Sequence, residues 1–106
     1  MPKYLYTARY SQSGISGVLK EGGSGRVGAV EELVRSLGGK VEAQYWAFGD
    51  DDYYLIVELP DNAAAAAASM TVAASGVGSI KTTVLLSAAE VDEAAKRHPS
   101  YRPPGQ

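Results

Sequence analysis

Apolar residues recur along the first third of the chain with two different periods. Residues 3–10 are rich in aromatic and β-branched types, which predicts a first strand. Residues 15–19 have the spacing of a short helical turn, which Gly22-Gly23 ends. Over 24–37 apolar side chains return every three or four positions behind Ser24, a candidate N-cap. The pattern predicts a strand, a helical turn and a longer helix closed by Gly38-Gly39.

The rest of the chain has the same mixture of patterns. Ser87 and Glu90 have the spacing of a capping box, in which each side chain satisfies a free amide at a helix start. Alanine, the best helix former, fills residues 63–68. The predicted elements are strands over 40–48, 53–59 and 79–86, a helix through the alanine block to about Gly76, and a helix over 87–97.

This order defines the fold class. A β-α-β-β-α-β sequence of elements with an extra C-terminal helix predicts an α+β, ferredoxin-like split βαβ fold. Two helices then cover one face of a four-stranded antiparallel sheet. The length of 106 residues fits one domain, over 1–98, and the prolines after it predict an extended tail over 99–106.

The face of the sheet without helices is expected to be partly apolar. A hairpin loop over 49–53 would pair Trp46 with Ile56 and Gln44 with Glu58. The core-facing residues are then Val41, Ala43, Tyr45, Ala47, Leu55, Val57 and Leu59. The uncovered ones are Glu42, Gln44, Trp46, Phe48, Tyr54, Ile56 and Glu58, joined by Lys81, Thr83 and Leu85. Because monomers rarely expose large apolar patches, we expect a homodimer or a higher even oligomer; a half-exposed sheet is the alternative.

Composition narrows the function classes. The formal net charge is -2 and the cations are scattered, which argues against a nucleic-acid partner. Without cysteine there is no disulfide, thiol catalyst or cysteine-type zinc site. No signal-peptide core and no run of 18 apolar residues is visible, so we expect no membrane span and a cytoplasmic location.

A resemblance to a known family extends over the stretches 1–5, 19–24, 36–40, 45–49, 59–62, 74–76, 82–86 and 101–105. Together these stretches resemble the GYD-domain family of small bacterial and archaeal proteins. The resemblance implies a dimeric α+β barrel and a homo-oligomer; that group includes cofactor-free oxygenases and isomerases as well as proteins with no known reaction. In the family's Gly-x-Tyr-Asp motif, Asp51 stands here at the tyrosine position.

Three motifs suggest chemistry, and each has a simpler interpretation. Residues 23–28 read G-x-G-x-x-G but do not directly follow a strand, so we interpret them as a helix start, with a weaker option of an anion beside Arg26. Residues 50–52 are three aspartates of a solvated turn. The single histidine, His98, is interpreted as a helix C-cap residue. We therefore expect no metal and no cofactor.

The leading functional hypothesis is that this small homo-oligomeric protein binds a small, partly aromatic ligand in a cavity under the open sheet face. One alternative is a cofactor-free oxygenase or isomerase, with Glu42, Glu58 or Lys81 as general acid or base. Another is a structural or interaction module without a ligand. Catalytic residues stay unassigned. The candidate ligand-binding residues are Tyr6, Glu42, Gln44, Trp46, Tyr54, Glu58 and Lys81.

Overall fold

Four strands and three helices follow one another in the order β-α-β-β-α-β-α. The structure is a computed structural model that describes residues 1–106. The predicted α+β class and the order of elements are confirmed, with ends that differ by a few residues. The elements are β1 Lys3–Tyr10, α1 Gln12–Ser36, β2 Lys40–Trp46, β3 Tyr53–Glu58, α2 Asn62–Ala74, β4 Gly78–Leu85 and α3 Ala88–Ala95.

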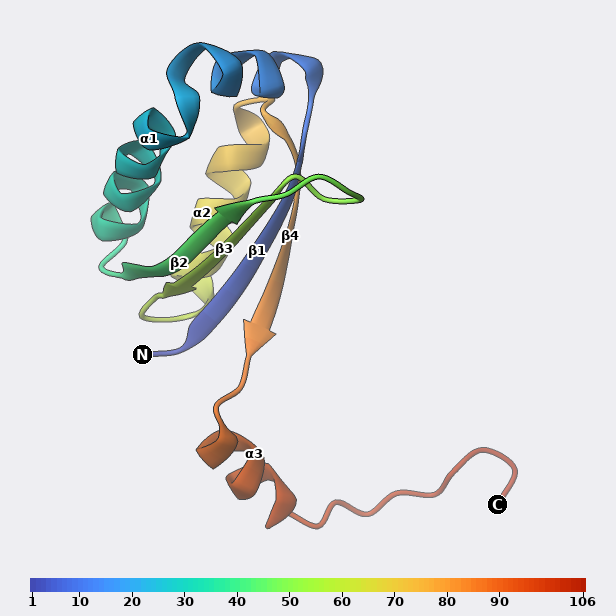
Figure 1. The fold of residues 1–106 in the computed structure, drawn as a ribbon. Coiled ribbons are helices and arrows are strands. Elements are labelled where there is room, and N and C mark those ends of the chain that lie inside the picture. Colours follow the sequence, from blue (N-terminus) through green and yellow to red (C-terminus); the bar gives the residue numbers. More distant parts are fainter.

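The sheet has the strand order of a ferredoxin-like fold. Its order is β2-β3-β1-β4, and every neighbouring pair is antiparallel. β1 therefore lies in the interior of the sheet, between β3 and β4. The helices α1 and α2 pack on one face, and no helix covers the other, which we call the open face (Figure 1).

Helix α1 consists of two segments that meet at Gly22. This glycine has φ +78° and ψ 165°, which interrupts the helix as the sequence predicted. The first segment is longer than the predicted turn, because it begins at Gln12 behind Ser11, whose hydroxyl accepts the Gly14 N–H. The chain changes direction at the break, so the two segments lie at an angle over the sheet (Figure 1).

The hydrophobic core lies between the two helices and the sheet. Alternate residues of β1 and β3 point into it, among them Tyr4, Tyr6 and Val57, which are almost fully buried. Both tyrosine hydroxyls reach α2: Tyr4 donates to the Asn62 side chain at 2.7 Å and Tyr6 to the Ala65 carbonyl at 2.6 Å. Small alanine side chains on α2 allow this close approach, so the alanine block is packing surface.

The register of the β2–β3 hairpin differs from the predicted one. Trp46 pairs with Tyr53 and Gln44 with Leu55, so the predicted pairing of Trp46 with Ile56 is wrong. The loop is longer than expected because β2 ends at Trp46, where the Ala47 N–H donates to the Asp52 carbonyl. An irregularity between Val41 and Ala43 then shifts the alternation.

This register exchanges the predicted faces of β2. Gln44 and Trp46 share the helix-covered face with Leu55, whereas Ala43 and Tyr45 lie on the open face. The prediction failed because pairing Trp46 with Tyr53 instead of Ile56 moves β2 by an odd number of residues relative to β3, which exchanges the faces of Ala43 to Trp46. The irregularity between Val41 and Ala43 then returns Val41 to the helix-covered face, where the sequence had placed it.

The C-terminal arm, residues 86–106, leaves the domain at the end of β4. Its helix α3 has the predicted capping box, with Ser87 and Glu90 bonded to each other's backbone N–H at 3.1 Å. Every residue of the arm is exposed, and it extends away from the sheet (Figure 1). None of the three helices combines the length and apolarity needed to cross a membrane.

Candidate functional site

A cavity of about 220 Å³ lies between α1 and the helix-covered face of the sheet. One wall is aromatic: Tyr6 and Tyr10 come from β1, Trp46 from β2 and Tyr53 from β3. On the α1 side, Gly17 lies in the first segment, where a Cβ atom would meet nothing within 4 Å. The break in α1 and the missing glycine side chain therefore leave this space between helix and sheet unfilled.

The aromatic wall is held by ring packing and two hydrogen bonds. The ring centroids of Trp46 and Tyr53 are 5.0 Å apart at 50°, a favourable tilted arrangement. The Trp46 indole Nε1–H donates to the Tyr10 hydroxyl at 3.0 Å. The Tyr53 hydroxyl donates to Gln44 Oε1 at 2.6 Å. These contacts fix the ring positions, so the wall exists before any ligand arrives.

The phenols of this wall stay protonated at neutral pH. Burial raises the pKa of Tyr6 to about 12. Burial also raises the pKa of Tyr10 and of Tyr53, and in both cases the positive charge of Arg26 opposes the shift. Arg26 lines the same cavity as both rings. The wall thus offers neutral hydroxyl groups next to one cation.

Two charged residues border the cavity on either side of the α1 break. The Arg26 guanidinium donates to Glu21 Oε2 at 3.3 Å, and both residues line the cavity. The side chains keep 35% and 47% of their surface exposed, respectively. A single long contact with partial exposure makes this a weak ion pair, so both groups can also bind other partners.

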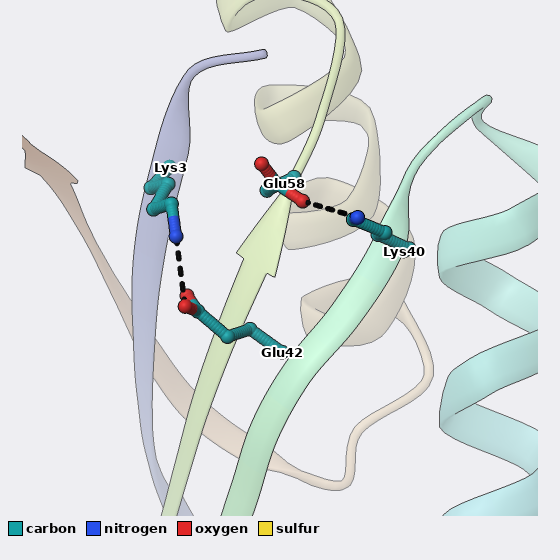
Figure 2. Close-up of polar contacts among 4 residues, drawn as sticks. All are labelled: Lys3, Lys40, Glu42 and Glu58. Carbon is teal, nitrogen blue, oxygen red and sulfur yellow. Dashed lines mark hydrogen bonds and ion pairs between the residues drawn. The ribbon is translucent and has the colours of Figure 1, made fainter.

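The open face carries a second set of polar residues. Lys3 on β1 pairs with Glu42 on β2 at 2.7 Å, and Lys40 on β2 pairs with Glu58 on β3 at 3.1 Å (Figure 2). The hydrogen bond from Lys40 lowers the pKa of Glu58, and that with Glu42 raises the pKa of Lys3. A fifth residue, Lys81, pairs with an aspartate of the β2–β3 loop. Each carboxylate of this face thus has a cation beside it.

The structure divides the seven predicted ligand residues between these two surfaces. Tyr6 and Trp46 line the cavity, and Gln44 supports it through Tyr53. The expected single cluster is therefore not formed, because the actual hairpin register separates Trp46 and Gln44 from the rest. The four residues on the open face are Glu42, Tyr54, Glu58 and Lys81.

Four of the aromatic and charged residues that line the cavity were not among the candidate ligand-binding residues: Tyr10, Glu21, Arg26 and Tyr53. Tyr10 has the same alternation as Tyr6, which could have placed it on this wall. Tyr53 required the correct register. Glu21 and Arg26 became neighbours only through the break between them. The glycine-rich segment around Arg26 begins the second helical segment, as interpreted from the sequence. Gly23 lies against the Trp46 ring, because a Cβ atom on Gly23 would be 3.8 Å from that ring.

Two minor sequence interpretations need correction. The aspartate loop is tied to the sheet and is not merely solvated: Asp52 Oδ2 accepts the Tyr10 backbone N–H at 2.9 Å, and Asp51 pairs with Lys81. The short loop folds back onto β1, which brings these carboxylates to partners. α3 ends at Ala95 with Lys96 as its C-cap residue, so His98 lies beyond the helix.

Comparison with known proteins gives one informative result. The family model described as GYD domain matches residues 4–95. No curated protein and no solved structure matches the chain. The matched range contains the cavity and all of the open face described above except Lys3, and it ends with α3, so that residues 1–3 and 96–106 lie outside it.

Proposed function

The chain belongs to the GYD-domain family, and from its cavity we propose that it binds a small, partly aromatic molecule between α1 and the sheet. The observation that supports this is the aromatic wall. Tyr10, Trp46 and Tyr53 are held in position around an unfilled space of about 220 Å³. A preformed apolar cavity with a few convergent polar groups is what small-molecule sites share.

The size and lining of the cavity suit a compact ligand. Most of its lining residues are apolar, and its volume lies below the range of about 300–1,000 Å³ that is usual for ligand sites. A one- or two-ring aromatic body would lie against Trp46 and Tyr53, whose side chains line the cavity. This replaces the open-face location that the sequence suggested.

The enzyme hypothesis gains no support from the residues first considered for it. Glu42, Glu58 and Lys81 lie on the open face, away from the cavity. Glu58 has a pKa lowered by Lys40, whereas a general base working near neutral pH needs a raised one. The carboxylate that borders the cavity is Glu21, which is partly exposed and paired with Arg26. Binding is therefore the function we propose.

A ligand screen tests this proposal. Molecules that enter the cavity should quench the single tryptophan, Trp46, and raise the melting temperature by mass action. The variant Gly17→Leu should lose both responses, because the leucine side chain would occupy the cavity. Gly28→Leu is the matched control, since this glycine lies on the same helix but does not line the cavity, and its Cβ would also meet nothing within 4 Å. A broad aromatic screen that moves neither signal would refute the proposal.

We also propose that the protein works as an even homo-oligomer that associates through the open face. Only 12 of the 106 residues are buried in the single chain, and Tyr45, Tyr54 and the C-terminal arm are exposed. The open face alternates lysines and glutamates across neighbouring strands (Figure 2). A two-fold axis there can bring the lysines of one copy against the glutamates of the other, which favours a second copy as the partner.

Light scattering measures this assembly directly. We expect an even multiple of the 11.1 kDa chain at micromolar concentration, with a mass that does not fall on tenfold dilution. A monomer under these conditions would contradict the oligomer. It would leave the cavity proposal standing, because the cavity is built within one chain.

A further inference from the structure

The hydroxyl groups of the aromatic wall are not equivalent. The Tyr6 and Tyr53 protons are donated within the protein, to the Ala65 carbonyl and to Gln44. The Tyr10 hydroxyl accepts the indole N–H of Trp46, and its own proton has no protein acceptor. Tyr10 is therefore the hydroxyl group of this wall that is free to donate a hydrogen bond to an oxygen atom of a ligand.

Arg26 adds a cation with donors to spare. A guanidinium has five N–H donors in a planar fork that matches a carboxylate, and here one bonds Glu21 at 3.3 Å. Arg26 lines the same cavity as Tyr10 and Tyr53, and its charge opposes the rise that burial causes in the pKa of both phenols. Arg26 and Tyr10 thus each present a hydrogen-bond donor to the cavity, beside a Glu21 carboxylate that can be displaced, and this arrangement suits an oxygen-rich, negatively charged group.

We propose that the ligand is a small aromatic carboxylate, whose ring lies against Trp46 and whose carboxylate is held by Arg26 and the Tyr10 hydroxyl. This inference rests on the proposed function and names its ligand class. The incoming carboxylate replaces Glu21 on the guanidinium, forming two short charged hydrogen bonds where one long one was lost. Glu21 is exposed enough to turn into solvent when it is displaced. Glu21 therefore competes with the ligand for the Arg26 guanidinium. A carboxylate ligand can displace it, whereas a neutral or cationic ligand cannot.

Three probes of similar size separate the ligand classes. 2-Naphthoate, 2-naphthamide and 2-naphthylmethylammonium carry a negative, a zero and a positive charge on the same ring system. Titration calorimetry on the full chain should give the highest affinity for 2-naphthoate, about tenfold or more above the amide, since hydrogen bonds to charged groups are the stronger ones.

Substitutions at the two charged residues test the roles separately. Arg26→Gln should weaken 2-naphthoate about 10- to 100-fold and leave the amide within about threefold. Glu21→Gln should strengthen 2-naphthoate, because the competing carboxylate is gone. Arg35→Gln is the control: Arg35 lies on the same helix, pairs with Glu32 and is outside the cavity, so its loss should change neither probe. Circular dichroism confirms that each variant is folded.

The outcomes distinguish this inference from the function on which it rests. If the amide or the ammonium binds as well as 2-naphthoate, or if Arg26→Gln changes nothing, the carboxylate assignment is wrong while the cavity remains a ligand site. If none of the three probes binds at millimolar concentration and the aromatic screen also fails, both proposals fall. Tighter binding of 2-naphthoate that is lost in Arg26→Gln and kept in Arg35→Gln establishes the assignment.

Discussion

Replacing Gly17 with leucine should make the protein more stable, although it fills the site that we assign to the ligand. Gly17 lies on the first segment of α1, it lines the cavity, and a Cβ there would meet nothing within 4 Å. Two gains add up. Leucine is a better helix former than glycine by about 0.8 kcal/mol. Its side chain also leaves water for an apolar cavity, which contributes about 1–2 kcal/mol for partial burial.

The control substitution separates these two gains. Gly28→Leu on the second segment has the same effect on helix propensity, but its side chain points away from the cavity into open space. We expect it to gain about 0.8 kcal/mol alone. For a domain of this size, 1 kcal/mol changes the melting temperature by about 4–8 °C. Gly17→Leu should therefore melt roughly 10 °C or more above the parent, and Gly28→Leu only about 3–6 °C above it.

Thermal unfolding followed by circular dichroism, at one fixed protein concentration, provides the measurement. The fixed concentration matters because association would itself shift the melting temperature. If Gly17→Leu melts at or below Gly28→Leu, the space beside Gly17 cannot accept a side chain, and the cavity between α1 and the sheet is not the open site described here.

Three further outcomes follow from the structure. Stability should decrease as the pH rises from about 10 toward 12, because the folded state keeps Tyr6 protonated after the unfolded chain has lost that proton, and denaturant titrations across this range measure it. Gly14→Ala should cost about 3 kcal/mol by urea unfolding, since its Cβ would lie 2.0 Å from a backbone carbonyl oxygen. Gly17→Ala in the same helix should instead gain about 0.8 kcal/mol, and equal effects would contradict this packing. Ile56→Asp on the open face should raise the dissociation constant of the oligomer at least tenfold, measured by light scattering on a dilution series. Leu19→Asp, on the exposed side of α1, should leave it unchanged. An unchanged mass for both variants would exclude the open face as the interface.

The sequence by itself determined the order of the elements and, to within a few residues, where each begins and ends. Period-2 and period-3.6 patterns, the capping box at Ser87 and the glycines at 22–23 and 38–39 are local signals, and each acts within a few residues of the chain. Local signals are sufficient for a β-α-β-β-α-β order, and that order leaves few topologies for a four-stranded sheet. The family resemblance and the fold class were therefore accessible without coordinates.

Only the tertiary structure decided which residues form the site. The faces of β2 depend on one irregular residue near Glu42 and on where the hairpin loop closes, and neither has a local signature in the chain. Trp46 consequently moved from the open face into the cavity. Arg26 and Glu21 came to border that cavity because the break at Gly22 turns one helix segment against the other. The site combines residues from three strands and a broken helix, so its geometry depends on contacts between distant parts of the chain. A sequence pattern indicates which side chains prefer burial, but not which residues they contact.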